Sequence, residues 1–275
     1  MKIATYNVNS VNARIENLCS WLQKEQPDIV LLQEIKCEFN AFPFFEINAA
    51  GYDVKILGQK SYNGVAVLSR HKITIECENI PTFKDDNARY LEALIQIEGQ
   101  KVRVASIYLP NGNPPYNDSS DTSKFDYKLA WMDAFAQRTQ ELVHQEEPVI
   151  LGGDFNIIKT DKDVYNPELF RGNALFRPEV IHRLQAIEYQ GWSDAFLLSQ
   201  IKTAALSEKQ ENGYTYWDYA GGAFPADLGL RIDYLYLSPK AADMLSKCWV
   251  DKSPRRGAKP SDHTALVAEF NLKKV

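Results

Sequence analysis

The sequence predicts an α/β fold in which two β-sheets pack face to face and helices cover their outer faces. Apolar segments of strand length recur along the whole chain, and two longer segments, at 12–25 and 123–146, carry apolar residues at helical spacing. Short turns such as Asn63-Gly64 and Glu98-Gly99 indicate antiparallel neighbours, which argues against a simple parallel Rossmann sheet. Strands with helices between and outside them favour sheets covered by helices.

The elements are expected in a definite order. Residues 2–8 form a buried strand, the helix at 12–25 ends at Pro27, and the apolar run at 29–32 is typical of an interior strand. Further strands are expected at 52–57, 65–68, 73–77, 91–97, 102–108, 149–151, 232–237 and 264–270, with a helix at 178–190. The polar segments 110–123, 159–177 and 200–214 are predicted to be connections.

The bulk composition is that of an ordinary globular protein. The chain has 275 residues, of which 45% are hydrophobic and 24% charged, and it has no internal repeat or long linker. We therefore expect a single domain over residues 1–275, and a monomer. A net charge of -5 argues against binding nucleic acid through bulk positive charge, but it does not exclude nucleic acid as a substrate.

The compartment is predicted from the cysteines and the N-terminus. The four cysteines are scattered with no metal-binding spacing, which fits reduced thiols. The chain begins without an apolar leader, and no stretch approaches the roughly 18 apolar residues of a membrane span. A cytoplasmic protein that does not contact membranes is expected.

Acidic and amide side chains recur where apolar strands end. They are Asn7, Asn9, Glu34, Asp154, Asn156, Asp233 and Asp262, the last followed by His263. Strand ends bring distant segments to one rim of a sheet, and an oxygen-rich cluster suits a hard cation such as Mg²⁺. Each piece alone has an ordinary alternative, because Gly153–Asn156 can be a turn and Ser261–His263 a capping segment. Together they predict metal-dependent phosphate chemistry.

The order of these segments is more specific than any one of them. They are Tyr6–Asn9, Leu32–Lys36, Tyr108–Gly112, Gly152–Asn156, Leu230–Tyr234 and Pro260–His263. This series resembles the exonuclease III family of abasic-site DNA endonucleases, in its bacterial branch, within the endonuclease/exonuclease/phosphatase superfamily. The resemblance implies a DNase I-like four-layer α/β sandwich, with two packed mixed β-sheets flanked by helices.

The resemblance also implies a role for each residue of the site. Glu34 is the expected principal Mg²⁺ ligand with support from Asn7, and Mn²⁺ is expected to substitute. The other side of the metal site is expected to be lined by Asp154, Asn156, Asp262 and His263. The catalytic residues are then Asp154 to orient or deprotonate the water, Asn156 and His263 to contact the phosphate, Asp233 to fix the tautomer of His263, and Tyr108 to assist at the leaving group.

The residues that would contact the substrate are predicted from weaker sequence patterns. Arg89 matches a family arginine near bound DNA, and Lys124 starts the long helix beside the Tyr108 loop, although each can be a solvated charge. The resemblance implies a pocket wall for an abasic sugar made of Tyr216, Trp217, Leu230 and Ile232, which can also be simple core residues. An apolar slot too tight for a base would select a nucleotide that lacks one.

The predicted activity is Mg²⁺-dependent incision of double-stranded DNA 5′ to an abasic site in base-excision repair, with 3′→5′ exonuclease activity and trimming of blocked 3′ ends. A phosphodiesterase acting on lipids is the first alternative, but it would need a histidine where Tyr108 stands. A non-catalytic DNA-binding module is the second, and it would have lost a metal ligand or the pair of Asp233 and His263. The expected metal ligands and the pair of Asp233 and His263 are all present.

Overall fold

The structure, a computed structural model, describes residues 1–115, 121–203 and 212–272 and contains two six-stranded sheets. The first sheet has the order β11 (Leu245–Asp251), β12 (Ala265–Phe270), β1 (Lys2–Asn7), β2 (Ile29–Gln33), β4 (Val65–Ser69), β3 (Asp53–Leu57). The second has the order β5 (Ile73–Glu78), β6 (Tyr90–Ile97), β7 (Gln100–Tyr108), β8 (Val149–Asp154), β10 (Asp233–Leu237), β9 (Ser193–Asp194).

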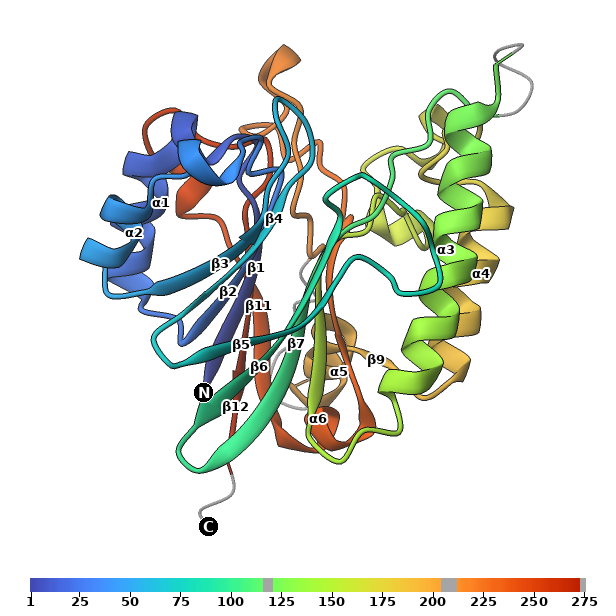
Figure 1. The fold of residues 1–275 in the computed structure, drawn as a ribbon. Helices are drawn as coiled ribbons and strands as arrows, with labels where there is room; N and C mark the ends of the chain where they lie inside the picture. Colours follow the sequence, from blue (N-terminus) through green and yellow to red (C-terminus); the bar gives the residue numbers. More distant parts are fainter. Residues whose placement is uncertain (116–120, 204–211, 273–275) are drawn as a thin grey trace.

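Helices cover the outer face of each sheet (Figure 1). Against the first sheet lie α1 (Val11–Glu25) and α2 (Phe44–Ala49), and against the second lie α3 (Ser123–Leu142) and α4 (Pro178–Tyr189). Alternation along the strands separates the layers, since Ile3 packs between the sheets whereas its neighbour Ala4 packs toward α1. The predicted four-layer sandwich is confirmed.

Strand direction gathers the polar strand ends at one end of the sandwich. β1 pairs parallel with β2, and β7 pairs parallel with β8, so Asn7, Gln33, Tyr108 and Asp154 all end their strands at that end. β10 runs antiparallel to β8 and begins there, with Asp233 opposite Asp154. Residues far apart in the sequence thereby meet.

Some elements differ from the sequence expectation. The long helix ends at Leu142 rather than near 146, and a two-residue strand, three short helices and one edge strand were not predicted. These elements are β9, α2, α5 (Ala195–Thr203), α6 (Pro239–Met244) and β11. The edge strand β11 was missed because its sequence, LSKCWVD, mixes polar residues with apolar ones and is only partly buried. The predicted connection at 200–214 in fact begins inside α5, and 204–211 lie outside the described residues.

Across the described part of the chain, no helix is both long enough and apolar enough to span a membrane.

A charged cluster beneath α3 gives a first test of stability. Glu92 on β6 is fully buried, and its carboxylate accepts hydrogen bonds from Arg103 (2.5 Å), Arg138 (2.9 Å) and the Tyr90 hydroxyl (2.5 Å). Glu92→Gln removes the one fully buried carboxylate that both guanidinium groups share and leaves them the partly exposed Glu76, Glu147 and Glu141, so the free energy of unfolding in urea should fall by about 3–5 kcal/mol. The control is Glu141→Gln, which loses a surface pair with the same Arg138 and should cost less than about 1 kcal/mol. Equal losses would contradict the prediction.

Candidate active site

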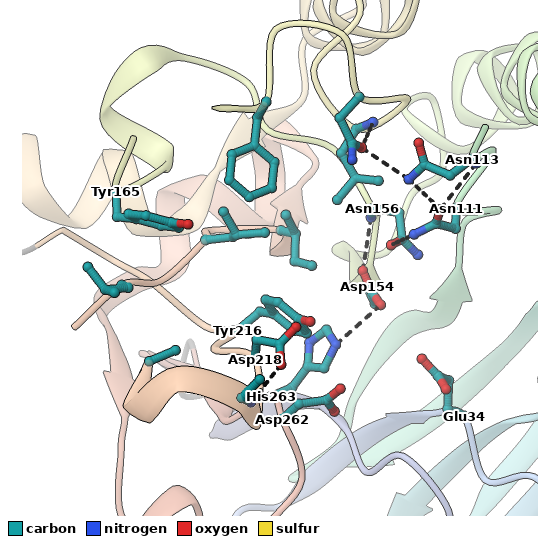
Figure 2. Close-up of a pocket in the computed structure, with 18 of the residues that line it drawn as sticks. Glu34, Asn111, Asn113, Asp154, Asn156, Tyr165, Tyr216, Asp218, Asp262 and His263 are labelled. Atoms are coloured by element: carbon teal, nitrogen blue, oxygen red, sulfur yellow. Dashed lines mark hydrogen bonds and ion pairs between the residues drawn. The ribbon is translucent and has the colours of Figure 1, made fainter. Parts of the chain in front are cut away.

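A cavity of about 640 Å³ lies at the end of the sandwich where the polar strand ends meet (Figure 2). One side of it is polar and carries Glu34, Asp154, Asp262 and His263. The other side is largely apolar and carries Tyr165, Phe170, Leu175, Tyr216, Leu228, Leu230 and Ile232. The cavity therefore joins a charged centre to an apolar recess.

Asn7 links the two principal carboxylates. Its Nδ2 donates to Oε1 of Glu34 (2.8 Å) and to Oδ2 of Asp154 (2.9 Å), while its Oδ1 accepts from the backbone N–H of Asn9 (3.0 Å), which fixes the orientation of the amide. Burial alone would raise the pKa of Glu34, but Lys36, whose Nζ lies 2.7 Å from Oε2, and Asn7 outweigh burial and lower it. Glu34 is therefore a carboxylate at neutral pH.

Asp154, Asp233 and His263 form a buried charge chain. Nδ1 of His263 lies 2.8 Å from Oδ2 of Asp233, so Nδ1 carries a proton and Nε2 faces Asp154, 3.7 Å from its Oδ2. Burial would lower the pKa of His263, but the two carboxylates outweigh burial and raise it to about 10. Burial, together with repulsion from Asp233 and Glu34, raises the pKa of Asp154 to about 7 against the opposing effect of His263.

The donor set at this centre fits a hard divalent cation. Glu34, Asp154 and His263 each offer an atom within 4.8 Å of the other two, and two of the three groups are carboxylates. Of the other three expected ligands, Asn7 donates to both carboxylates through Nδ2, Oδ1 of Asp262 accepts from Asn9 (3.0 Å), and Oδ1 of Asn156 accepts from Asn111 (3.2 Å). The residues present therefore fit a metal site centred on the two carboxylates.

Tyr108 lies at the end of β7 next to Arg89. The Arg89 guanidinium carbon lies 4.9 Å from the centre of the Tyr108 ring, and Nη1 donates to the Tyr108 carbonyl (3.2 Å). Burial and the neighbouring Glu34 raise the pKa of Tyr108 well above its usual range, so the phenol stays protonated and can donate. Lys124 is exposed at the start of α3, whereas Lys128, four residues on, is fully buried under the site and cannot reach a DNA phosphate.

The apolar recess contains three of the four expected wall residues. Tyr216 bridges to Leu230 and to His263 through the backbone, and its ring meets the imidazole edge-on at 5.0 Å, which joins the wall to the cluster of Glu34, Asp154 and His263. Ile232 lines the same recess, but Trp217 is fully buried behind it and can shape the wall only from the rear.

Several cavity residues were not found from the sequence. Tyr165, Phe170, Leu175 and Leu228 come from irregular segments, where no apolar period marks which side chains face inward. Asn113 and Asn173 were missed for the same reason, although the asparagine-rich stretch 111–113 was a visible sign.

Comparisons with known proteins agree with this geometry. A model of the Endonuclease/Exonuclease/phosphatase family matches residues 4–263. An exodeoxyribonuclease III of Haemophilus influenzae is 29% identical over 277 residues, covering 98% of this chain and 100% of that protein. The structure of an AP endonuclease from Archaeoglobus fulgidus aligns with a TM-score of 0.85 and 31% identity, covering 99% of this chain and 100% of the other.

A further solved structure is described as a 3′ phosphatase from Neisseria bound to a product DNA hairpin. It aligns with a TM-score of 0.84 and 31% identity, covering 99% of this chain and 100% of the other. These findings confirm the predicted resemblance and the enzyme class, a hydrolase of the nuclease type. The chain belongs to the endonuclease/exonuclease/phosphatase family.

Proposed function

We propose that the protein is a Mg²⁺-dependent phosphodiesterase that incises double-stranded DNA 5′ to an abasic site and leaves a 3′-hydroxyl. It also trims blocked 3′ ends and degrades DNA in the 3′→5′ direction. The observation that carries the proposal is the junction of a carboxylate–imidazole centre with an apolar recess in one cavity. The names of the relatives, exodeoxyribonuclease III, AP endonuclease and 3′ phosphatase, support the same range of substrates.

Glu34 and Asp154 are the residues that would hold the metal, with Asn7 keeping both carboxylates in place. When bound, Mg²⁺ neutralises charge on the phosphodiester and favours ionisation of water. Asp154 orients the attacking water and accepts its proton, a role supported by its central position beside Glu34 and His263. We also place Asp262, Asn156 and His263 on the far side of the metal site.

The phosphate is held by side chains that donate hydrogen bonds. Nε2 of His263 points into the cavity and carries a positive charge while Asp233 holds Nδ1. The oxygen of Asn156 accepts from Asn111 and one N–H of its amide donates to the Leu109 carbonyl, so the second N–H is the group that donates to a non-bridging oxygen. Tyr108, kept protonated, stabilises charge near the leaving oxygen.

Recognition of the lesion depends on the recess. A sugar without a base is extruded from the helix at low cost and fits against Tyr216, Leu230 and Ile232. Trp217 supports that wall from behind, while Arg89 and Lys124 contact backbone phosphates. Within this proposal the protein acts as a monomer, and its cytoplasmic location stays a prediction.

Metal dependence on a defined lesion tests this function. Purified protein is incubated with a duplex that carries one tetrahydrofuran abasic analogue. Mg²⁺, or Mn²⁺ in its place, should give a single cut 5′ to the analogue with an end that a DNA polymerase extends, and EDTA should abolish the cut. No incision, or incision that survives EDTA, would refute the proposal.

Two glutamate variants locate the metal in the same assay. Glu34→Gln removes a ligand charge and should raise the Mg²⁺ concentration for half-maximal rate by about tenfold or more, while Glu16→Gln, exposed on α1, should leave it unchanged. An unchanged metal dependence in Glu34→Gln would remove Glu34 from the metal site.

A further inference from the structure

Four asparagine side chains form a continuous row of hydrogen bonds that begins at Asn156, next to Asp154, and runs through Asn111 and Asn113 (Figure 2) to Asn173. Nδ2 of Asn113 donates both to Oδ1 of Asn173 (3.1 Å) and to Oδ1 of Asn111 (2.8 Å). Nδ2 of Asn111 then donates to Oδ1 of Asn156 (3.2 Å), and Nδ2 of Asn156 donates to the carbonyl of Leu109 (2.9 Å). All four asparagines line the cavity.

Main-chain groups fix the direction of every amide in this row. Backbone N–H groups, which can only donate, point at the side-chain oxygens of Asn111, Asn113 and Asn173. The carbonyl of Leu109, which can only accept, fixes the nitrogen of Asn156. No amide can rotate by half a turn without losing a hydrogen bond, so the donor and acceptor ends of all four amides are fixed.

Asn113 is the junction of the row. Its amide makes three hydrogen bonds, two donated by Nδ2 and one accepted by Oδ1 from the N–H of Ala174 (3.0 Å). Two of these three bonds go to Asn173 and Ala174, in the irregular segment that places Phe170 and Leu175 in the apolar recess. Asn113 therefore ties this recess wall to the loop that follows β7.

Asn156 does not depend on Asn113 for its place. It is held by the carbonyl of Leu109, by Asn111, by Oδ1 of Asp154 (2.9 Å) and by buried Lys128, whose Nζ donates to the carbonyls of Asn156 (2.7 Å) and Asn111 (3.0 Å). The wall segment has main-chain hydrogen bonds of its own around Asn173 and Leu175, but its hydrogen bonds to the loop after β7 go through the side chain of Asn113. Loss of Asn113 should thus move the wall and leave the reacting centre in place.

We propose that Asn113 is a positioning residue that sets substrate selectivity by holding the 170–175 wall of the recess at a fixed place relative to the reacting phosphate. This inference rests on the proposed function, because the recess is taken as the site of the abasic sugar. The sugar on the 3′ side of the scissile phosphate occupies the recess, whereas a terminal 3′-phosphate has no sugar there. Asn113 therefore matters for the first substrate and not for the second.

The test measures kcat and KM on two duplexes, one with a tetrahydrofuran lesion and one with a 3′-phosphate end. Asn113→Ala and the near-isosteric Asn113→Asp, which loses both donated bonds, should lower kcat/KM on the lesion about 10- to 100-fold. Removal of the 3′-phosphate should change less than about threefold. Glu168→Gln, exposed in the same segment, is the matched control and should behave as wild type on both duplexes.

A double-mutant cycle gives a second, independent measurement on the lesion alone. If Asn113 acts through the wall, Asn113→Ala combined with Asn173→Ala should be no worse than the more damaging single variant. Any one of three results would overturn the inference. The first is that the fold-losses of the two single variants multiply in the double variant. The others are equal losses on both substrates, or an unchanged kcat/KM of Asn113→Ala on the lesion. Failure of the wild-type enzyme to cut the lesion would instead overturn the proposed function.

Discussion

Asp154→Asn is expected to lower kcat for incision by about 10²–10⁴-fold, the range that a positioned general base contributes. The substitution keeps the shape of the side chain and removes its ability to accept a proton from water. It also creates a donor-to-donor contact, because both Asn7 Nδ2 and the N–H of Asn156 donate to the Asp154 carboxylate. Single-turnover kinetics with excess enzyme separate this chemical defect from product release.

The same variant should bind the lesion duplex as well as wild type, and removal of the buried charge should offset the cost of the donor-to-donor contact, so that its stability near pH 7–8 stays close to that of wild type. Burial raises the pKa of Asp154 to about 7, so the folded state holds this proton more tightly than the unfolded state does. In the metal-free protein the ionised carboxylate thus costs stability, and the cost grows as pH rises from about 4 to about 7. Asp154→Asn lacks this cost above pH 7.

Loss of activity with retained stability is the signature to look for. Asp133→Asn, a surface carboxylate paired with Arg183, is the matched control and should alter neither property. Turnover within threefold of wild type, or a variant whose unfolding midpoint falls sharply in EDTA, would contradict the assignment of Asp154.

The fold was predictable where periodic patterns report burial. The run Ile29–Leu32 is apolar at every position, and the structure buries it completely in β2 between α1 and the second sheet. β11 was not predictable, because an edge strand needs little apolar surface and its identity depends on pairing with β12. Sequence patterns show which residues are buried, whereas pairing partners are decided by tertiary contacts.

The clustering of Glu34, Asp154 and His263 was predictable because these residues sit at strand ends in short ordered segments. Glu34, Asp154 and His263 are brought within reach of one another by two parallel strand pairs and the closing turn before β12. The residues that line the apolar recess were harder to predict from the sequence. Trp217 and Tyr216 are adjacent in sequence, yet only Tyr216 faces the cavity. In an irregular segment, no period tells which neighbour turns inward.

Asp233→Asn is the second substitution with a large expected effect, because it removes the charge that keeps His263 protonated. Asp233 gives the largest of the interactions that raise the pKa of His263 to about 10, against the opposing effect of burial. The amide can still accept from Nδ1, so the imidazole stays in place, but its pKa falls toward or below the ordinary value of about 6.5. The variant has an imidazole that is neutral near pH 8.

The direction of the pH effect follows from which protonation state of His263 supports catalysis. The protonated form attracts the phosphate, so activity is lost as pH rises through the pKa of His263, whereas ionisation of Asp154 sets the separate loss of activity at low pH. Wild type should therefore stay active until near pH 10, whereas Asp233→Asn should lose activity from about pH 7 upward, with kcat about 10²–10⁴-fold lower near pH 8–9 and a smaller deficit near pH 6. Asp243→Asn, exposed on α6, should keep the wild-type profile. A uniform loss at every pH would show that Asp233 only supports the fold of the site, and an unchanged profile would show that the charge of His263 does not take part in catalysis.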